Sequence, residues 1–300
     1  MSLIEKLHGM MVPLITPLTP DEELDEQALR KCIKHVIDGG VNGVFVHSTT
    51  GEGPCLLDHV REKAIEITAE ETKGKTLFMV GVNDTSTKRV LKNLKNIERY
   101  QPDAFVVHPP FFFSLNSQQE LLTFYRTLTE ATDLPIILYN IPGLTKQPLS
   151  IDTVRELLKN PKIIAIKDSS VDYLFLLELI KLKKDFPTFR IFVGKTHLFT
   201  PCLLAGGDGG VDGISNLIPE RCVRLVELIK AGKIIEAYRQ QDEINEIWNV
   251  YHVRSFVAGI KMAMHLAGLC GPTVSSPVLT LSEAEKEHVR AIMERYKLLA

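Results

Sequence analysis

Residues 163–170 read IIAIKDSS, and the lysine in this stretch decides how the chain is interpreted. The four apolar residues at 163–166 are typical of a short strand buried on both faces, and Lys167 follows them directly. A lysine ammonium group is costly to bury unless it is paired. Lys167 therefore either reaches solvent or has a use beside the core.

Apolar runs of the same kind recur along the chain and predict eight strands. They lie at residues 11–16, 43–47, 77–82, 104–108, 135–140, 163–167, 190–194 and 209–215. Longer amphipathic stretches between them predict helices, and strands joined by helical crossovers run parallel. We therefore predict an α/β fold, a closed (β/α)8 barrel. A doubly wound open sheet is the competing fold, but its first strand would lead into a glycine-rich turn, and MVPLITPLTP has no glycine.

The last eighty or so residues do not repeat this alternation. From Pro219 onward the pattern predicts helices only, at 220–231, 234–250, 256–267 and 282–299. We predict a barrel over residues 1–230 and a helical extension over residues 231–300 that packs on it.

Composition limits the partners and the location. A net charge of −2 with interspersed signs gives no footprint for nucleic acid or for an anionic membrane. No stretch reaches the roughly 18 apolar residues of a membrane span, and Glu5 and Lys6 precede any long apolar run. The five cysteines are scattered, which indicates reduced thiols in a cytoplasm, and we predict small core residues at Cys32, Cys55, Cys202, Cys222 and Cys270.

A barrel binds its ligands at the C-terminal ends of its strands, and Lys167 ends the sixth. An amine in an apolar pocket is more readily neutral, and a neutral amine attacks a ketone to form a Schiff base. The alternative is that Lys167 pairs with Asp168 or another acid and only closes the top of the barrel. Other strand ends carry polar groups as well: the segments 47–52, 108–112, 139–140 and 213–216.

With these motifs in this order, the chain resembles the dihydrodipicolinate synthase and N-acetylneuraminate lyase family of pyruvate-dependent class I aldolases. The likeness runs over residues 11–277 and rests on four motifs: TTGE at 49–52, YNIP at 139–142, IKD at 166–168 and GGDGGVDGISN at 206–216.

The resemblance implies roles for individual residues. Lys167 would be the Schiff-base lysine, Tyr139 the proton shuttle, and Thr49 and Thr50 the donors that hold the carboxylate of a 2-oxo acid. The other substrate-binding residues it implies are Ser48, Gly51, Gly213 and Ser215. It implies no cofactor and no metal, pyruvate or another 2-oxo acid plus an aldehyde as substrates, and a homotetramer or homodimer.

The chain departs from the family's pattern around the acceptor. Dihydrodipicolinate synthases usually carry an arginine where Leu144 stands, and a relay tyrosine where Phe111 stands. The lyase branch usually has acidic residues after strand seven, where this chain has Lys195, Thr196 and His197. The candidate acceptor contacts are His47, His108, Leu144, Lys195 and His197.

These departures favour an aldolase acting on a 2-oxo-3-deoxy sugar acid or a 4-hydroxy-2-oxo acid. The alternatives are a dihydrodipicolinate synthase and a non-catalytic pyruvate-binding sensor. The glycines of GGDGG could also cradle a phosphate, but they are expected to precede strand eight, at the wrong end of the barrel.

Overall fold

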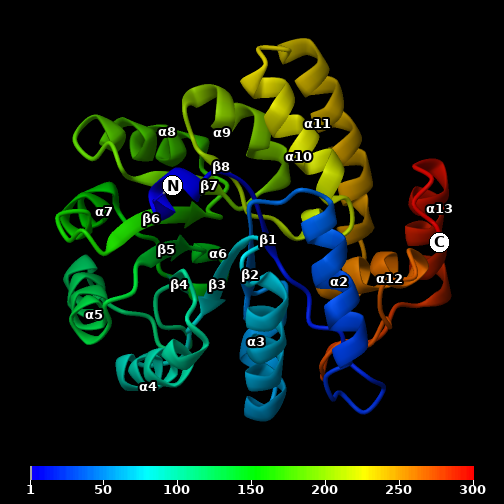
Figure 1. The fold of residues 1–300 in the computed structure, drawn as a ribbon, viewed down its shortest axis with the longest axis horizontal. Coiled ribbons are helices and arrows are strands. Elements are labelled where there is room, and N and C mark those ends of the chain that lie inside the picture. The colour runs from blue at the N-terminus through cyan, green and yellow to red at the C-terminus, as the bar shows by residue number, and fades with distance from the viewer. Residues whose placement is uncertain (1) are drawn as a thin grey trace.

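The computed structural model describes residues 2–300, and eight parallel strands in it form a closed barrel (Figure 1). Each strand pairs with the next along the chain, and the last pairs with the first, which confirms the predicted barrel and excludes the open sheet. The strands are β1 (Gly9–Pro13), β2 (Gly43–Val46), β3 (Leu77–Gly81), β4 (Ala104–Val107), β5 (Ile136–Asn140), β6 (Ile163–Asp168), β7 (Arg190–Val193) and β8 (Gly209–Gly210).

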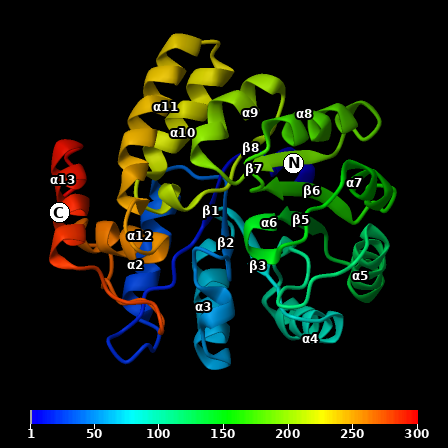
Figure 2. The ribbon, with the colours of Figure 1, turned by 180° about the vertical axis from the view of Figure 1, so that it is seen from behind.

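Helices follow the strands and surround the barrel, as predicted from the amphipathic stretches. They are α2 (Glu26–Asp38), α3 (Asp58–Thr72), α4 (Thr87–Ile97), α5 (Gln118–Ala131), α7 (Ile151–Leu157), α8 (Tyr173–Lys181), α9 (Phe199–Ala205) and α10 (Pro219–Lys230). Two short helices lie at opposite ends: α1 (Leu3–Lys6) precedes β1, and α6 (Pro142–Thr145) follows β5 (Figure 2). No helix formed by residues 2–300 is long and apolar enough to cross a membrane.

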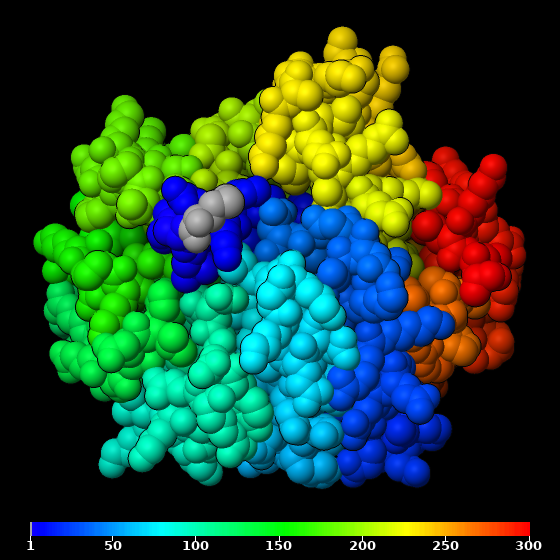
Figure 3. Space-filling view, viewed as in Figure 1, coloured from blue at the N-terminus to red at the C-terminus, as the bar shows by residue number. Residues whose placement is uncertain are grey.

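The C-terminal extension consists of α11 (Ile234–Trp248), α12 (Phe256–Leu266) and α13 (Glu283–Arg295). It packs on the barrel helices, and the Gln241 side chain on α11 accepts a hydrogen bond from the Thr200 amide on α9 at 3.1 Å. In the space-filling view the C-terminal residues, orange and red, lie at one edge beside α2 (Figure 3). The boundary between barrel and extension at residue 230 stays a prediction.

Side chains alternate between the barrel interior and the helix layer, as the period of two requires. The interior holds one apolar cluster, which includes Met11, Phe45, Met79, Tyr139, Ala165 and Phe192. The cluster between strands and helices includes Val44, Val46, Val80, Leu138 and Ile166. Because Ala165 faces inward, the same alternation turns Lys167 inward.

Four predictions of detail were wrong. Strand β1 begins at Gly9 rather than at residue 11, and β8 has two residues, because the chain leaves the barrel after Gly210. Gly209 and Gly210 form β8 instead of preceding it; a Cβ at Gly209 would lie 1.8 Å from the Gly9 carbonyl oxygen, so only glycine fits. Cys55 is exposed, unlike the other four cysteines, because it lies on the short helix η1 (Gly53–Cys55) at the surface.

Candidate active site

Lys167 and Tyr139 stand side by side at the C-terminal ends of β6 and β5, where they are partners in the strand register. Both are buried, and Lys167 Nζ lies 4.1 Å from the centroid of the Tyr139 ring and 5.4 Å from that of Phe45. Within residues 2–300, Nζ has neither an ion pair nor a hydrogen bond. A buried amine without a counter-ion beside aromatic rings is suited to act as a nucleophile.

Asp168 does not pair with Lys167, so that alternative is wrong. The Asp168 carboxylate accepts hydrogen bonds from Asn140 Nδ2 at 2.7 Å and from the Ser170 hydroxyl at 2.8 Å. Burial raises its pKa above the ordinary value, against the effect of these donors. Consecutive strand residues point to opposite faces of the sheet. Asp168 therefore faces the helix layer, and its carboxylate does not lie beside the Lys167 amine in the barrel interior.

The turn after β2 brings Thr49 to Tyr139. The Thr49 Oγ1 atom lies 3.5 Å from the Tyr139 hydroxyl, at the outer limit of a hydrogen bond. The turn is held by its own atoms: the Gly51 amide donates to Ser48 Oγ at 3.0 Å, and Thr16 Oγ1 donates to the Gly51 carbonyl at 2.7 Å. Ser48 thus supports the turn, and Thr49 and Thr50 follow it at the strand end.

A buried ion pair fixes this turn from behind, which sequence reasoning missed. Glu52, at a left-handed φ of 58°, pairs with Lys261 of α12. The two side chains are 4% and 0% exposed. Glu52 also accepts hydrogen bonds from the Ser275 amide at 2.8 Å and the Ser275 hydroxyl at 2.7 Å. A lysine inside the apolar run VAGIKMAMHL was the signal that could have revealed it.

The turn after β8, η5 (Gly213–Asn216), meets the end of β1. The Asn216 side chain donates to the Pro13 carbonyl at 2.9 Å and accepts from the Ile15 amide at 3.0 Å. The Ser215 hydroxyl is fully buried and donates to the Asp212 carbonyl, so it supports the turn. Gly213 lies beside Thr50, whose methyl carbon would be 2.9 Å from a Cβ at Gly213.

In the segment after β4, His108 packs against Tyr139 and Phe111 packs against His108. The His108 ring lies 5.9 Å from the Tyr139 ring and 5.7 Å from the Phe111 ring, between centroids. Burial lowers the pKa of His108 to about 4, so this imidazole is neutral near neutral pH. No hydroxyl stands where the family's relay tyrosine is expected, because that position carries Phe111.

The other candidate acceptor contacts fall in different surroundings. His47 lies in a small hollow of about 10 Å³ beside Arg61 and Asn83, and burial lowers its pKa to about 3. Leu144 is 58% exposed on α6. Lys195 follows Gly194, and a Cβ at Gly194 would lie 3.0 Å from Lys167 Cε. His197 is exposed, and its ring centroid lies 4.7 Å from that of Trp248. Of these residues, His108 is the one that the structure places against Tyr139.

A closed barrel with a buried lysine ending β6 and a tyrosine ending β5 defines a class, the class I aldolases and lyases. The comparisons narrow this class: the model of the dihydrodipicolinate synthetase family matches residues 6–296, and the chain belongs to that family. It is a carbon–carbon lyase of the class I aldolase type.

The similar proteins carry different enzyme names. The chain is 32% identical to an uncharacterized DapA-like lyase of Pyrococcus abyssi, over 96% of this chain and 97% of the relative. It is 28% identical to an N-acetylneuraminate lyase of Salmonella agona, over 98% of each. Among solved structures, YagE, a prophage protein of this family from E. coli K12 solved in complex with pyruvate, superposes with a TM-score of 0.93 at 26% identity, covering 97% of this chain and 99% of that one.

Proposed function

We propose that Lys167 forms an imine with pyruvate, and that the protein makes or cleaves a 4-hydroxy-2-oxo acid, such as a 2-oxo-3-deoxy sugar acid. The observation that carries the proposal is the buried Lys167 Nζ, without a counter-ion in residues 2–300 and 4.1 Å from the Tyr139 ring centroid. The pyruvate bound by the related YagE supports the choice of 2-oxo acid.

The chemistry proceeds in balanced steps. The neutral Lys167 Nζ attacks C2 of pyruvate and gives a carbinolamine, whose hydroxyl takes up one proton delivered through Tyr139 and leaves as water, so that a protonated imine remains. Loss of a proton from C3 gives an enamine, and C3 then bonds to the aldehyde carbon, whose oxygen takes up a proton. Water hydrolyses the product imine and restores the amine. Cleavage is the reverse sequence.

The side chains around Lys167 have complementary tasks in this proposal. Tyr139 carries protons between the carbonyl oxygen, the nitrogen and solvent, with Thr49 Oγ1 3.5 Å from its hydroxyl as the next group in line. The turn holds the carboxylate of pyruvate in this proposal through the hydroxyls and backbone amides of Thr49 and Thr50, while the Gly51 amide stays bonded to Ser48 Oγ.

The acceptor is proposed to be a hydroxylated aldehyde rather than aspartate semialdehyde. Leu144 has no charge to hold a second carboxylate, and its side chain is 58% exposed on α6. Lys195 and His197, at the end of β7, offer polar contacts instead. We propose the cytoplasm as the location.

The first experiment traps the imine. The protein is incubated with pyruvate, reduced with borohydride and digested, and mass spectrometry should find one adduct, on Lys167. Lys162→Arg is the matched control, because Lys162 precedes the same strand at its other end and pairs with Asp133 at 3.1 Å. Lys162→Arg should keep the adduct and Lys167→Arg should lose it. An unmodified Lys167 in the wild type refutes the proposal.

The second experiment identifies the acceptor class. With pyruvate fixed, kcat/KM is compared for aspartate semialdehyde, glyceraldehyde, glyoxylate and N-acetylmannosamine. A missing bidentate carboxylate contact costs about 2 to 4 kcal/mol, so the semialdehyde should be slower than the best acceptor by about 30-fold to 1,000-fold. A semialdehyde that wins by about tenfold favours the synthase alternative. Adduct formation without turnover favours the sensor.

Assembly into a homotetramer or homodimer is part of the proposal. It is supported by Phe112 and Phe113, which are 83% and 75% exposed and pack on each other at 5.0 Å between ring centroids. Two adjacent exposed phenylalanines are typical of a surface that is covered in an assembly. Light scattering at micromolar concentration tests this, and a monomer refutes it.

A further inference from the structure

Tyr251 is a buried tyrosine with an unsatisfied hydroxyl. It ends the short helix η6 (Asn249–Tyr251) of the C-terminal extension and is 8% exposed. Among residues 2–300 its hydroxyl has no hydrogen-bond partner. Its ring is fixed by Trp248 at 5.3 Å and Phe256 at 6.4 Å between centroids. An unpaired buried hydroxyl is rare because it loses its bonds to water, so this one indicates an external partner.

Gly213 shows where this hydroxyl points. A Cβ at Gly213 would lie 2.5 Å from the Tyr251 hydroxyl oxygen and 3.2 Å from Thr50 Oγ1. Gly213 does not have a positive φ, so a side chain is excluded there by the Tyr251 hydroxyl together with the Thr50 methyl carbon, at 2.9 Å from that Cβ, and not by the backbone conformation. The Tyr251 hydroxyl thus takes the space of a side chain at 213, between the end of β8 and the turn after β2.

We propose that Tyr251 is a specificity-determining residue that donates its hydroxyl hydrogen to a hydroxyl oxygen of the acceptor aldehyde. This inference rests on the proposed function and names the group of the acceptor that the site recognises. A substrate hydroxyl both accepts and donates, so it can accept from Tyr251 and donate to the neighbouring Thr50 Oγ1.

Charge around Tyr251 favours a neutral hydroxyl over a second carboxylate. Burial raises the pKa of Tyr251 well above its ordinary value, so the phenol stays protonated and acts as a donor. The Asp212 carboxylate, just before Gly213, raises the same pKa further, and this nearby negative charge disfavours an anionic ligand. The carboxylate of the 2-oxo acid already has donors in the Thr49 and Thr50 turn.

The kinetic test uses Tyr251→Phe and three aldehydes of equal length. Propanal, lactaldehyde and glyceraldehyde carry no, one and two hydroxyls, and each is assayed with pyruvate. The wild type should prefer the hydroxylated aldehydes, and Tyr251→Phe should reduce the ratio of kcat/KM for glyceraldehyde over propanal by roughly 10-fold to 100-fold. Tyr238→Phe, which removes the hydroxyl of a 47% exposed tyrosine on α11, should leave the ratio unchanged.

A stability measurement separates ligand binding from a structural role. Without ligand, Tyr251→Phe removes an unsatisfied buried group, so its Tm should be equal to or higher than that of the wild type. Gly213→Ala should lower the ratio as Tyr251→Phe does, and the double variant should not lose the sum of both effects, since the added Cβ then has no hydroxyl to displace.

Other outcomes overturn the inference. A lower Tm for Tyr251→Phe means that the hydroxyl is bonded within the protein. An unchanged aldehyde ratio, or equal loss on all three aldehydes, means that it does not read the acceptor, and no turnover with any of them also refutes it. Failure of the proposed function is distinct, because the wild type would then show no pyruvate adduct on Lys167, whereas Tyr251→Phe should form this adduct as the wild type does.

Discussion

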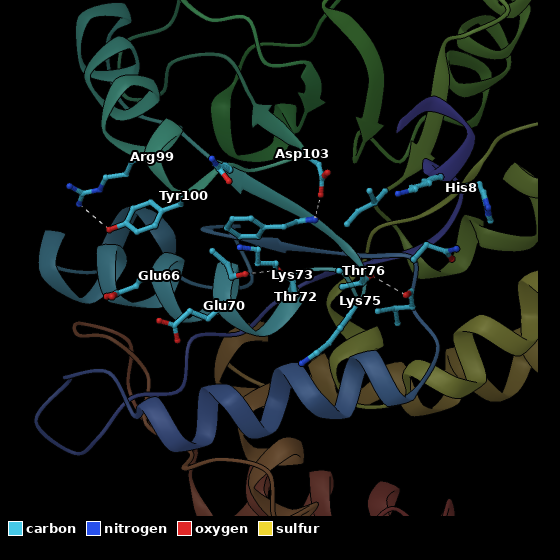
Figure 4. Close-up of a pocket in the computed structure, with 18 residues that line it drawn as sticks. His8, Glu66, Glu70, Thr72, Lys73, Lys75, Thr76, Arg99, Tyr100 and Asp103 are labelled. Atoms are coloured by element: carbon cyan, nitrogen blue, oxygen red, sulfur yellow. Dashed lines mark hydrogen bonds between the residues drawn. The ribbon is translucent and has the colours of Figure 1, made fainter. Parts of the chain in front are cut away.

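The two ends of the barrel differ in the size of their cavities and in how far their buried polar atoms are hydrogen-bonded. At the N-terminal end of the strands lies a cavity of about 760 Å³, lined by charged residues that include Glu66, Glu70, Lys73, Lys75 and Arg99 (Figure 4). A second cavity, of about 400 Å³, lies between α3 and α4 and is lined by His47, Asp84 and Arg89, whereas the hollow that Lys167 lines inside the barrel is only about 10 Å³. Volume alone would therefore not select the surroundings of Lys167 as the candidate site.

Hydrogen bonding distinguishes the ends better than volume does. In the N-terminal cavity, Glu70 pairs with Arg30 at 2.8 Å, Asp103 accepts from the Phe78 amide at 2.8 Å, and Thr76 donates to the Val41 carbonyl at 3.2 Å. These interactions join α3 to α2, the loop before β4 to the neighbouring strand β3, and the loop before β3 to the loop before β2. At the catalytic end, Tyr251 and His47 each keep a buried polar atom without a partner in residues 2–300.

The difference teaches that an active site is marked by polar groups left unpaired, since these groups await a ligand. A barrel's N-terminal face contributes stability and its C-terminal face contributes chemistry. Substitutions in the N-terminal cavity should therefore leave catalysis unchanged, whereas those at the C-terminal ends of the strands should change stability or turnover strongly, and four predictions test this.

The largest effect is expected at the ion pair behind the catalytic turn. Lys261→Met leaves the Glu52 carboxylate, 4% exposed, without its counter-ion, and should lower the free energy of unfolding by about 3 to 5 kcal/mol. Urea unfolding measures the loss. The double variant Glu52→Gln with Lys261→Met should recover part of it, because no charge then remains buried. A loss of less than about 1 kcal/mol for Lys261→Met would show that the pair behaves like a surface ion pair.

Most of the catalytic end could be predicted from the sequence where the signal is local. Lys167 and Tyr139 each end an apolar run, and alternation along a strand turns both inward. Phe111 and Leu144 were recognised as departures in the same way, by their distance from a motif. The barrel itself followed from the recurrence of apolar runs and helices.

Features that depend on distant parts of the chain could not be predicted. Glu52 and Ser275 are 223 residues apart, and no pattern near either one indicates the other. Tyr251 stands in a helical segment whose period predicts burial but not the direction of the hydroxyl. Strand β8 was predicted too long because its length is set by the close approach of Gly209 to Gly9.

Tyrosine hydroxyls at the two ends should differ in their effect on catalysis. Tyr139→Phe should lower kcat by about 100-fold to 1,000-fold and change pyruvate binding by less than about threefold, because a proton shuttle acts on the steps between bound states. Tyr100→Phe removes a hydroxyl that accepts from Arg99 at 2.9 Å in the N-terminal cavity and should leave kcat unchanged. Equal losses of binding and turnover in Tyr139→Phe would indicate a structural role instead.

Acid should destabilise the catalytic end through its buried histidines. Burial lowers the pKa of His47 to about 3 and that of His108 to about 4, from an ordinary value of 6.5. Below pH 6.5 these histidines therefore bind protons in the unfolded chain but not in the folded one. The free energy of unfolding is highest above pH 6.5 and falls as the pH drops toward the pKa values of the folded protein. Between pH 7 and pH 5 each histidine should cost about 2 kcal/mol.

Urea unfolding of His108→Asn at both pH values measures the share of this residue. The variant should lose about 2 kcal/mol less than the wild type between pH 7 and pH 5. His59→Asn is the control, since His59 is 62% exposed and pairs with Glu23 at 2.7 Å. An unchanged pH dependence in His108→Asn would mean that this imidazole is protonated in the folded protein.

The smallest effect is expected for a charge in the N-terminal cavity. Glu70 and Arg30 are 53% and 40% exposed, so water screens their interaction, and Glu70→Gln should change the free energy of unfolding by less than about 1 kcal/mol. The same substitution should leave kcat/KM and the Lys167 adduct unaltered, because the cavity lies at the opposite end of the strands from the proposed chemistry. Urea unfolding and steady-state assays of Glu70→Gln beside the wild type test both points. A fall of about tenfold or more in kcat/KM with unchanged stability would mean that the large cavity communicates with the catalytic end, and the division of labour between the two ends would then be wrong.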